Sequence, residues 1–209
     1  MTGVRARRSF GFASMLLALC PLAGCALLAP APPEPVKEIL DRTPDAVPRA
    51  PRRAGVLVVM VSHGAPLYDT SSIAYRTRGA GLARFARHEW ADTPARMLQP
   101  LVIDTLGRTQ AFGAVVAPPY FGHAPATLRV EIDELLADFT AAPAAVRLAL
   151  RAMLRDDAGR LATRTITADA RIADETPAGV VRAANDAAAQ ALLALAAFVI
   201  GSGSGSAQP

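Results

Sequence analysis

Apolar and polar positions alternate with a different period in successive parts of the chain. The run Val56–Val61 is continuously apolar and mostly β-branched, which is typical of a buried strand. Weak alternation begins at Ile73 and clearer alternation covers Leu82–Trp90, so two further strands are predicted there. Four later segments also carry strand patterns, namely residues 112–117, 128–135, 146–154 and 161–172.

Two segments have helical spacing instead. Thr93 and Pro94 form an N-cap followed by a proline at the first helical position, and the apolar residues after them predict a helix that ends at Gly107. Pro100 lies inside this segment and removes a hydrogen bond, so we expect the helix either to kink there or to begin its regular part there. The second helix opens at Thr176-Pro177. Its apolar face consists of Val181, Ala184, Ala188, Leu192, Leu195 and Val199. Its final part, residues 187–200, is too short for a membrane span and predicts a core helix.

The order of these elements is three strands, a helix, four strands and a helix. It predicts an α/β (α+β) fold of one domain, in which two main helices cover a mixed, largely antiparallel sheet. This arrangement buries the apolar face of every predicted element.

The N-terminus carries the three parts of a secretory signal. Arginines at positions 5, 7 and 8 precede the apolar stretch Phe10–Leu19, and Leu22-Ala-Gly-Cys25 closes the segment. That closing pattern is a bacterial lipobox, in which the cysteine is joined to diacylglycerol and the bond before it is cut. An ordinary signal peptide and an uncleaved anchor are the alternatives. Because Cys20 leaves with the signal, Cys25 is the only cysteine of the mature chain and no disulfide can form.

Seven prolines fall within residues 26–53, and such a composition favours an extended, solvated segment. A glycine–serine repeat begins at Gly201 and indicates a flexible end. The predicted division is therefore residues 1–24 as signal peptide, 25–53 as lipid-anchored linker, 54–200 as folded domain and 201–209 as tail. Packing of part of the linker on the domain is the alternative.

Charge and histidine spacing exclude several classes of function. The chain has 22 Lys and Arg against 18 Asp and Glu, and removal of the three signal arginines leaves nineteen against eighteen. We therefore expect no nucleic-acid partner. The histidines, His63, His88 and His123, lack metal-ligand spacing, and no nucleotide-binding glycine pattern occurs, so no metal and no cofactor are expected.

A catalytic constellation is also missing from the sequence. Ser62 and His63 with Asp69 are the only cluster that resembles a triad, and adjacent residues of a strand point to opposite faces. The acidic residues at 131, 133 and 134 fit the solvated face of a strand. We therefore expect a protein that is not an enzyme, since a hydrolase needs a nucleophile–base pair.

Five segments resemble those of one known family. They are Ile73–Arg76, Ala86–Leu98, Phe112–Val116, Asp156–Arg160 and Ala183–Ala187. In these segments, and over nearly all of residues 56–200, the chain resembles the ABC-type transport auxiliary lipoproteins. The part from Trp90 to Pro94 is the most specific. Pro100 and the long linker depart from the family pattern without touching these segments.

The resemblance implies an accessory of an MCE-type ABC system, which moves phospholipids or related lipids between the inner and outer membranes. The partners it implies are an MCE-domain protein and, through acylated Cys25, the membrane. Phospholipid and a second copy of the chain are further candidate partners. Since Ala26 is not an acidic retention residue, we expect the periplasmic face of the outer membrane. The competing hypothesis is a structural envelope lipoprotein that tethers an assembly without handling lipid.

Five residues are candidate contacts for a partner or a lipid: Tyr75, Arg76, Arg84, Arg87 and Trp90. Aromatic rings and arginines are the usual anchors of an interface, and arginines also bind lipid phosphates. The alternative is that Tyr75 and Trp90 only fill the core beneath the first helix.

Overall fold

Eight strands, two α-helices and a short 3-10 helix follow one another in the residues that the computed structural model describes, 33–79 and 81–202. The strands are β1 (Val36–Glu38), β2 (Val56–His63), β3 (Ser72–Thr77), β4 (Gly81–Trp90), β5 (Ala114–Val116), β6 (Ala126–Asp138), β7 (Ala145–Asp156) and β8 (Leu161–Arg171). The helices are η2 (Pro66–Tyr68), α1 (Pro94–Arg108) and α2 (Pro177–Ser202). The compact unit that they form begins at Pro35.

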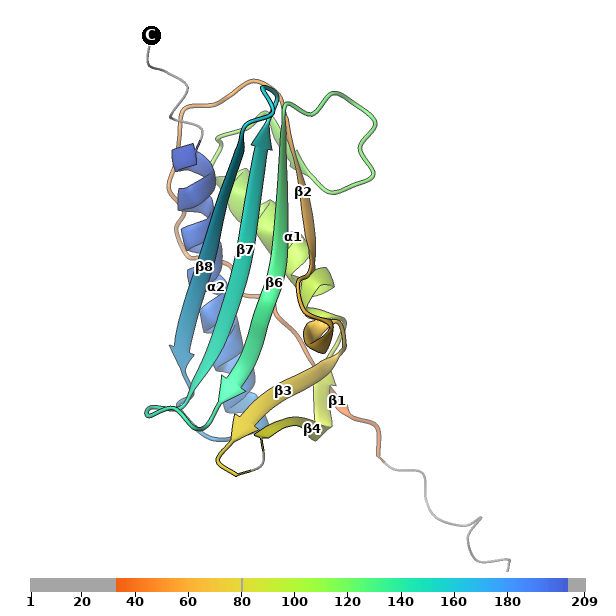
Figure 1. Cartoon of the computed structure of the whole chain (residues 1–209), viewed down its shortest axis with the longest axis vertical. Helices are drawn as coiled ribbons and strands as arrows, with labels where there is room; N and C mark the ends of the chain where they lie inside the picture. The colour runs from red at the N-terminus through yellow and green to blue at the C-terminus, as the bar shows by residue number, and fades with distance from the viewer. Residues whose placement is uncertain (1–32, 80, 203–209) are drawn as a thin grey trace, which may run out of the picture. The chain divides into compact units, whose positions relative to one another are not determined.

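Strand β6 is the centre of the sheet because it is long enough to take two different neighbours on one side. It pairs antiparallel with β7 along its whole length, and β7 pairs antiparallel with β8. On its other side, β2 runs parallel to residues 126–132 and β3 runs parallel to residues 137–138. The sheet therefore branches: β5 extends it beyond β2, whereas β4 and β1 extend it beyond β3 (Figure 1).

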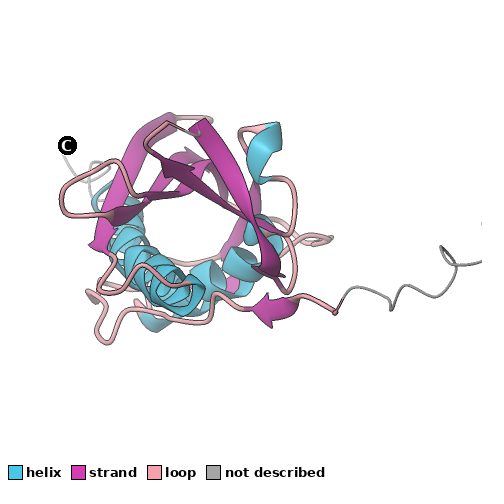
Figure 2. Ribbon diagram, turned by 90° about the horizontal axis from the view of Figure 1, so that it is seen from below, coloured by secondary structure: helices cyan, strands magenta, loops and turns pink. Residues whose placement is uncertain are grey.

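The two helices pack on one face of this sheet, with α2 against β7 and β8 and α1 against β2 (Figure 2). Five of the six residues on the predicted apolar face of α2 are buried, and Val181 is partly buried against the core. By length and composition α2 could cross a membrane, but 61% of its most apolar window is buried inside the fold. The predicted mixed sheet with two covering helices is confirmed, and its longest ladders are antiparallel.

Helix α1 begins at Pro94 as predicted, but it differs from its prediction at Pro100 and at its C-terminal end. It runs from Pro94 through Pro100, so its regular part does not begin at Pro100. Gly107 lies inside the helix, which ends at Arg108, and Gln110 then takes a positive φ of 58°. Thr93 occupies the N-cap position as predicted, but its side chain makes no capping hydrogen bond.

A polar side chain of α1 completes the edge of strand β2. Strand β5 pairs only with residues 56–58 of β2, which leaves backbone groups of the next residues without a strand partner. Gln99 supplies that partner, since its Oε1 accepts from the Val61 amide (2.7 Å) and its Nε2 donates to the Val59 carbonyl (2.8 Å). The amide thus satisfies buried backbone groups that an apolar residue would leave unpaired.

The prediction that residues 25–53 form a linker is wrong for residues 36–53. Residues 36–38 form strand β1 on the edge of β4, and Leu40 is only 4% exposed. We call residues 36–53 the strap. The structure supports the alternative, in which part of the linker packs on the domain, because backbone groups of the strap form hydrogen bonds with residues far away in the sequence.

Other predicted boundaries meet the limits of the described residues. The signal peptide, Cys25 and the linker up to residue 32 lie outside them and stay predictions, as does the tail from residue 203. Helix α2 continues to Ser202, two residues past the predicted end of the domain.

Candidate functional site

The β3–β4 hairpin carries most of the predicted contact residues. In its register, Ala74 pairs with Arg84 and Arg76 with Leu82, so Arg76, Leu82 and Arg84 share one face of the hairpin. Both arginines are exposed, and the side chain of Leu82 is 45% exposed between them. The hairpin therefore presents an apolar side chain flanked by two guanidinium groups.

The opposite face of the hairpin holds an aromatic cluster. The ring of Tyr75 lies 4.6 Å from that of Phe85, centroid to centroid, and 6.0 Å from that of Phe139 in an edge-on arrangement. All three residues are partly buried. Tyr75 thus packs against the hairpin and the chain after β6, and only part of its ring is open to a partner.

The hairpin is strongly positive. Residues 70–88 contain four arginines and one histidine but no Asp or Glu. Arg76 forms an ion pair with Asp138 (3.5 Å), whereas the other three arginines form none with any residue that the structure describes: Arg78, Arg84 and Arg87. The Thr140 hydroxyl, which donates to Asp138, lowers the pKa of that carboxyl, and Arg76 adds to this effect.

Trp90 does not belong to the exposed surface, and its prediction as a contact residue is wrong. It is 2% exposed, pairs with Glu38 of β1 and donates its backbone amide to the Ser71 carbonyl. A ring so enclosed cannot touch a partner. The alternative, that Trp90 fills the core, is the one that the structure supports.

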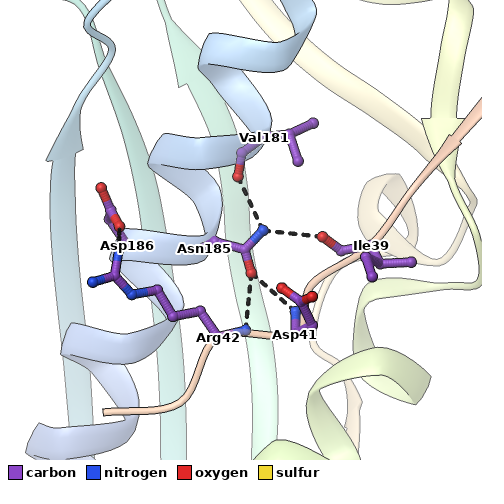
Figure 3. Close-up of polar contacts among 6 residues, drawn as sticks. All are labelled: Ile39, Asp41, Arg42, Val181, Asn185 and Asp186. Atoms are coloured by element: carbon purple, nitrogen blue, oxygen red, sulfur yellow. Dashed lines mark hydrogen bonds and ion pairs between the residues drawn. The ribbon is translucent and has the colours of Figure 1, made fainter. Parts of the chain in front are cut away.

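Beside the hairpin, the strap is held by a side chain that the sequence did not single out. Asn185 of α2 accepts hydrogen bonds from the amides of Asp41 (2.9 Å) and Arg42 (3.1 Å) through Oδ1. Its Nδ2 donates to the carbonyls of Ile39 (3.0 Å) and Val181 (3.2 Å). Figure 3 shows the amide between the strap and the helix, with all four contacts directed to backbone groups.

Further contacts hold the rest of the strap. Arg42 forms an ion pair with Asp186, the residue after Asn185. The Arg108 guanidinium donates to the carbonyls of Pro44 (2.8 Å) and Asp45 (2.9 Å). The strap therefore crosses both helices, and one side chain of each helix forms hydrogen bonds with the backbone of the strap.

The residues that resembled a triad do not form one. His63 Nδ1 lies 3.1 Å from an Asp69 carboxylate oxygen, but no hydrogen bond joins Ser62 to His63 in the described part of the chain, and His63 Nε2 is buried without a partner. Arg151 pairs with Glu131 (3.5 Å) and Asp133 (2.7 Å), as expected for the solvated face of a strand. Among residues 33–79 and 81–202, no group of three His, Cys, Asp or Glu side chains could hold a metal.

A cavity of about 320 Å³ opens at the other end of the fold. Phe112, Leu154 and Leu161 contribute its apolar lining. Arg53 at its rim already donates to the Ile200 carbonyl (2.8 Å) and lies 5.3 Å from the centre of the Phe112 ring. The volume is at the lower end of the range that holds drug-sized ligands.

Comparison with known proteins gives one family and several structures. The family model described as the ABC-type transport auxiliary lipoprotein component matches residues 40–196, which include most of the strap. The crystal structure of protein XCC0632 from Xanthomonas campestris, of family DUF330, is 21% identical with a TM-score of 0.68, over 83% of this chain and 99% of that one. A crystal structure of an uncharacterized protein is 18% identical with a TM-score of 0.58, over 76% and 98%. These two structures share the fold. A search of curated proteins finds no match.

Proposed function

The chain belongs to the ABC-type transport auxiliary lipoprotein component family, and from this we propose that it is the outer-membrane accessory of an MCE-type ABC system for intermembrane phospholipid transport. The family makes it a membrane-anchored lipoprotein that serves an ABC system. The MCE partner, the lipid cargo and the outer membrane are the finer parts of the proposal.

One observation carries the proposal: the family match extends from Leu40 to Ala196 and so covers almost the whole fold. It includes most of the strap, the β3–β4 hairpin, helix α1 and most of helix α2. The role we propose is binding and docking, not catalysis.

The anchor in this proposal is Cys25, acylated after cleavage of the signal peptide. Ala26 follows it and is not an acidic retention residue, which favours the outer membrane. The contact residues we propose are Tyr75, Arg76, Arg84 and Arg87 on the hairpin. Trp90 is omitted because it is buried.

The competing role is a tether that holds an envelope assembly without affecting lipid movement. Two measurements in a deletion strain complemented with the full chain separate the roles. The first is cross-linking of the lipoprotein to the MCE-domain subunit, and the second is the rate at which labelled phospholipid passes between the two membranes.

We expect the transport role to give both a cross-link and a slower exchange of phospholipid when the gene is deleted. A cross-link with an unchanged exchange rate would support the tether. If the lipoprotein neither cross-links to the MCE subunit nor alters the exchange rate, the proposed function is wrong.

A further inference from the structure

The chain from the anchor joins the fold next to the positive hairpin. Val36, the first residue of β1, pairs with His88 of β4, one residue from Arg87. Val36 is the eleventh residue after Cys25 in the sequence. At about 3.1 Å per residue in polyproline II extension, this length reaches about 35 Å, so a membrane that holds Cys25 lies within that distance of the hairpin.

The hairpin has the chemistry of a surface that binds anionic headgroups. Three exposed arginines have no ion pair with a described residue: Arg78, Arg84 and Arg87. A guanidinium group binds phosphate through paired hydrogen bonds, and each arginine near an anionic bilayer strengthens binding roughly five-fold, which corresponds to about 1 kcal/mol. Leu82 lies on the same face as Arg84 and is 45% exposed, so it can enter the interface between headgroups and acyl chains.

The loop between β5 and β6, at the opposite end of the fold, lacks this combination. The segment 117–125 joins β5 to the start of β6 and carries Phe121, which is 96% exposed, but it contains no Lys or Arg. Strand β6 is 13 residues long and β3 pairs with its last two residues, so about 40 Å separates this segment from the hairpin (Figure 1). Arg129, Arg155 and Arg164 are also exposed toward that end, but the chain from Cys25 joins the fold at the hairpin end. Exposed arginines and this junction therefore occur together only at the hairpin.

We propose that the exposed surface of the hairpin, with Leu82 and Arg84 on one face and the exposed Arg78 and Arg87 elsewhere on it, lies on the anionic phospholipid headgroups of the membrane in which Cys25 is anchored. This proposal rests on the proposed function, because it requires acylation of Cys25. The short tether keeps the local concentration of headgroups high, so weak contacts suffice to orient the domain. The opposite end, with Phe121, then faces away from the membrane.

The test uses the mature, acylated chain in vesicles of phosphatidylcholine with or without phosphatidylglycerol. Since acylation consumes the thiol of Cys25, one added cysteine carries a fluorophore. Ala86→Cys labels the exposed hairpin, and Asp157→Cys labels the exposed turn between β7 and β8 at the other end. Lipids with a nitroxide on the headgroup quench only a label that lies at the bilayer surface.

We expect strong quenching at position 86 in vesicles that contain phosphatidylglycerol, weak quenching in phosphatidylcholine alone, and little quenching at position 157. The hairpin variant reverses three charges: Arg78→Glu, Arg84→Glu and Arg87→Glu. It should lose the quenching, because three five-fold contributions amount to about 100-fold in binding. The matched control reverses three other exposed arginines without ion pairs in the described part of the chain: Arg129→Glu, Arg155→Glu and Arg164→Glu. It should keep the quenching.

Three results would overturn the proposal. The first is an unquenched label at position 86 in the wild-type chain, and the second is equal quenching in the hairpin variant and the control. The third is a hairpin variant that loses its cross-link to the MCE subunit while none of the labelled chains is quenched. In that case the hairpin binds a protein and not the lipid headgroups, and the proposed function still stands. A chain that does not stay with the vesicles contradicts acylation, and the proposed function fails with the inference. Thermal melts of both triple variants show whether each is folded.

Discussion

Replacement of Asn185 by alanine tests whether the strap is part of the folded domain. The side chain makes three hydrogen bonds to the strap, to the amides of Asp41 and Arg42 and the carbonyl of Ile39. Alanine removes all three and leaves the helix intact, since alanine is the best helix former. We therefore expect Asn185→Ala to loosen the strap without unfolding α2.

The size of the effect follows from the number of bonds and their access to water. A protein hydrogen bond contributes about 0.5–1.5 kcal/mol net, and here water can reach the released groups of the strap, so the lower part of that range applies. Three bonds then contribute about 1.5–2 kcal/mol. This energy raises the population of the open strap about ten- to thirty-fold. Leu40 stays as a second contact, because its buried side chain is unaffected.

Hydrogen exchange followed by mass spectrometry measures that population directly. The amides of residues 41 and 42 should exchange about ten- to thirty-fold faster in Asn185→Ala than in the wild type, whereas amides of β6 and β7 should be nearly unchanged. Asp186→Ala is the matched control, since it removes only an exposed ion pair with Arg42, and such pairs contribute little. Equal exchange at residues 41 and 42 in the wild type and Asn185→Ala would refute the role of Asn185 in holding the strap.

Three further predictions concern the anchor, the core and the acid response. Cys25→Ser should leave an uncleaved precursor without fatty-acid label, and a labelled variant in the outer-membrane fraction contradicts the lipobox. Leu192→Ala and Leu195→Ala remove fully buried side chains and should each cost about 2–5 kcal/mol in thermal or denaturant unfolding, while Leu193→Ala, 43% exposed, should change little. The pKa of Asp138 is lowered in the fold, so its carboxylate stabilises the protein above its unfolded pKa of about 4, and this stability is lost as pH falls through the folded pKa. The difference in melting temperature between the wild type and Asp138→Asn should therefore shrink between pH 7 and pH 3, and a constant difference contradicts the assignment.

The strands and helices of the main domain could be predicted because each buries a regular face. The period of the apolar residues indicates which face is buried in three clear cases: the run at residues 56–61, the alternation over 128–135 and the helical face that ends at Val199. The branched sheet could not be read from these patterns. The sheet branches because β6 is long and β3 pairs only with its residues 137–138. Such pairing between distant strands produces no periodic pattern within either strand's own sequence.

The strap escaped prediction because its stability comes from residues far away in the sequence. Its prolines and mixed charge resemble a solvated linker, and Leu40 alone makes no pattern. The partners, Asn185 and Arg108, are polar residues of helices whose periodicity reports only their apolar side. One signal was readable, since Ala183–Ala187, which contains Asn185, was among the segments that resembled the family.

The exposure of the candidate contact residues was predicted in part, for a similar reason. Alternation over residues 82–90 placed arginines on an exposed strand, and the structure exposes Arg84 and Arg87 as expected. Nothing in that alternation distinguished Trp90, whose burial depends on β1, a strand inside the supposed linker. The absence of any acid from residues 70–88 was visible in the sequence and would have added Arg78 to the set.

The strap also changes how far the domain can stand from its membrane. A free segment from Cys25 to residue 53 reaches about 85 Å at polyproline II extension, whereas the segment up to Val36 reaches about 35 Å. If the strap stays bound, a partner embedded in the opposite membrane must approach the domain, because the domain cannot extend to meet it. Release of the strap would more than double the reach and would move the hairpin away from the lipid surface. If Cys25 is the anchor, as we propose, the contacts of Asn185 and Arg108 set the distance over which this accessory can act. A variant that weakens these contacts should then extend that distance and loosen the orientation of the domain on the membrane.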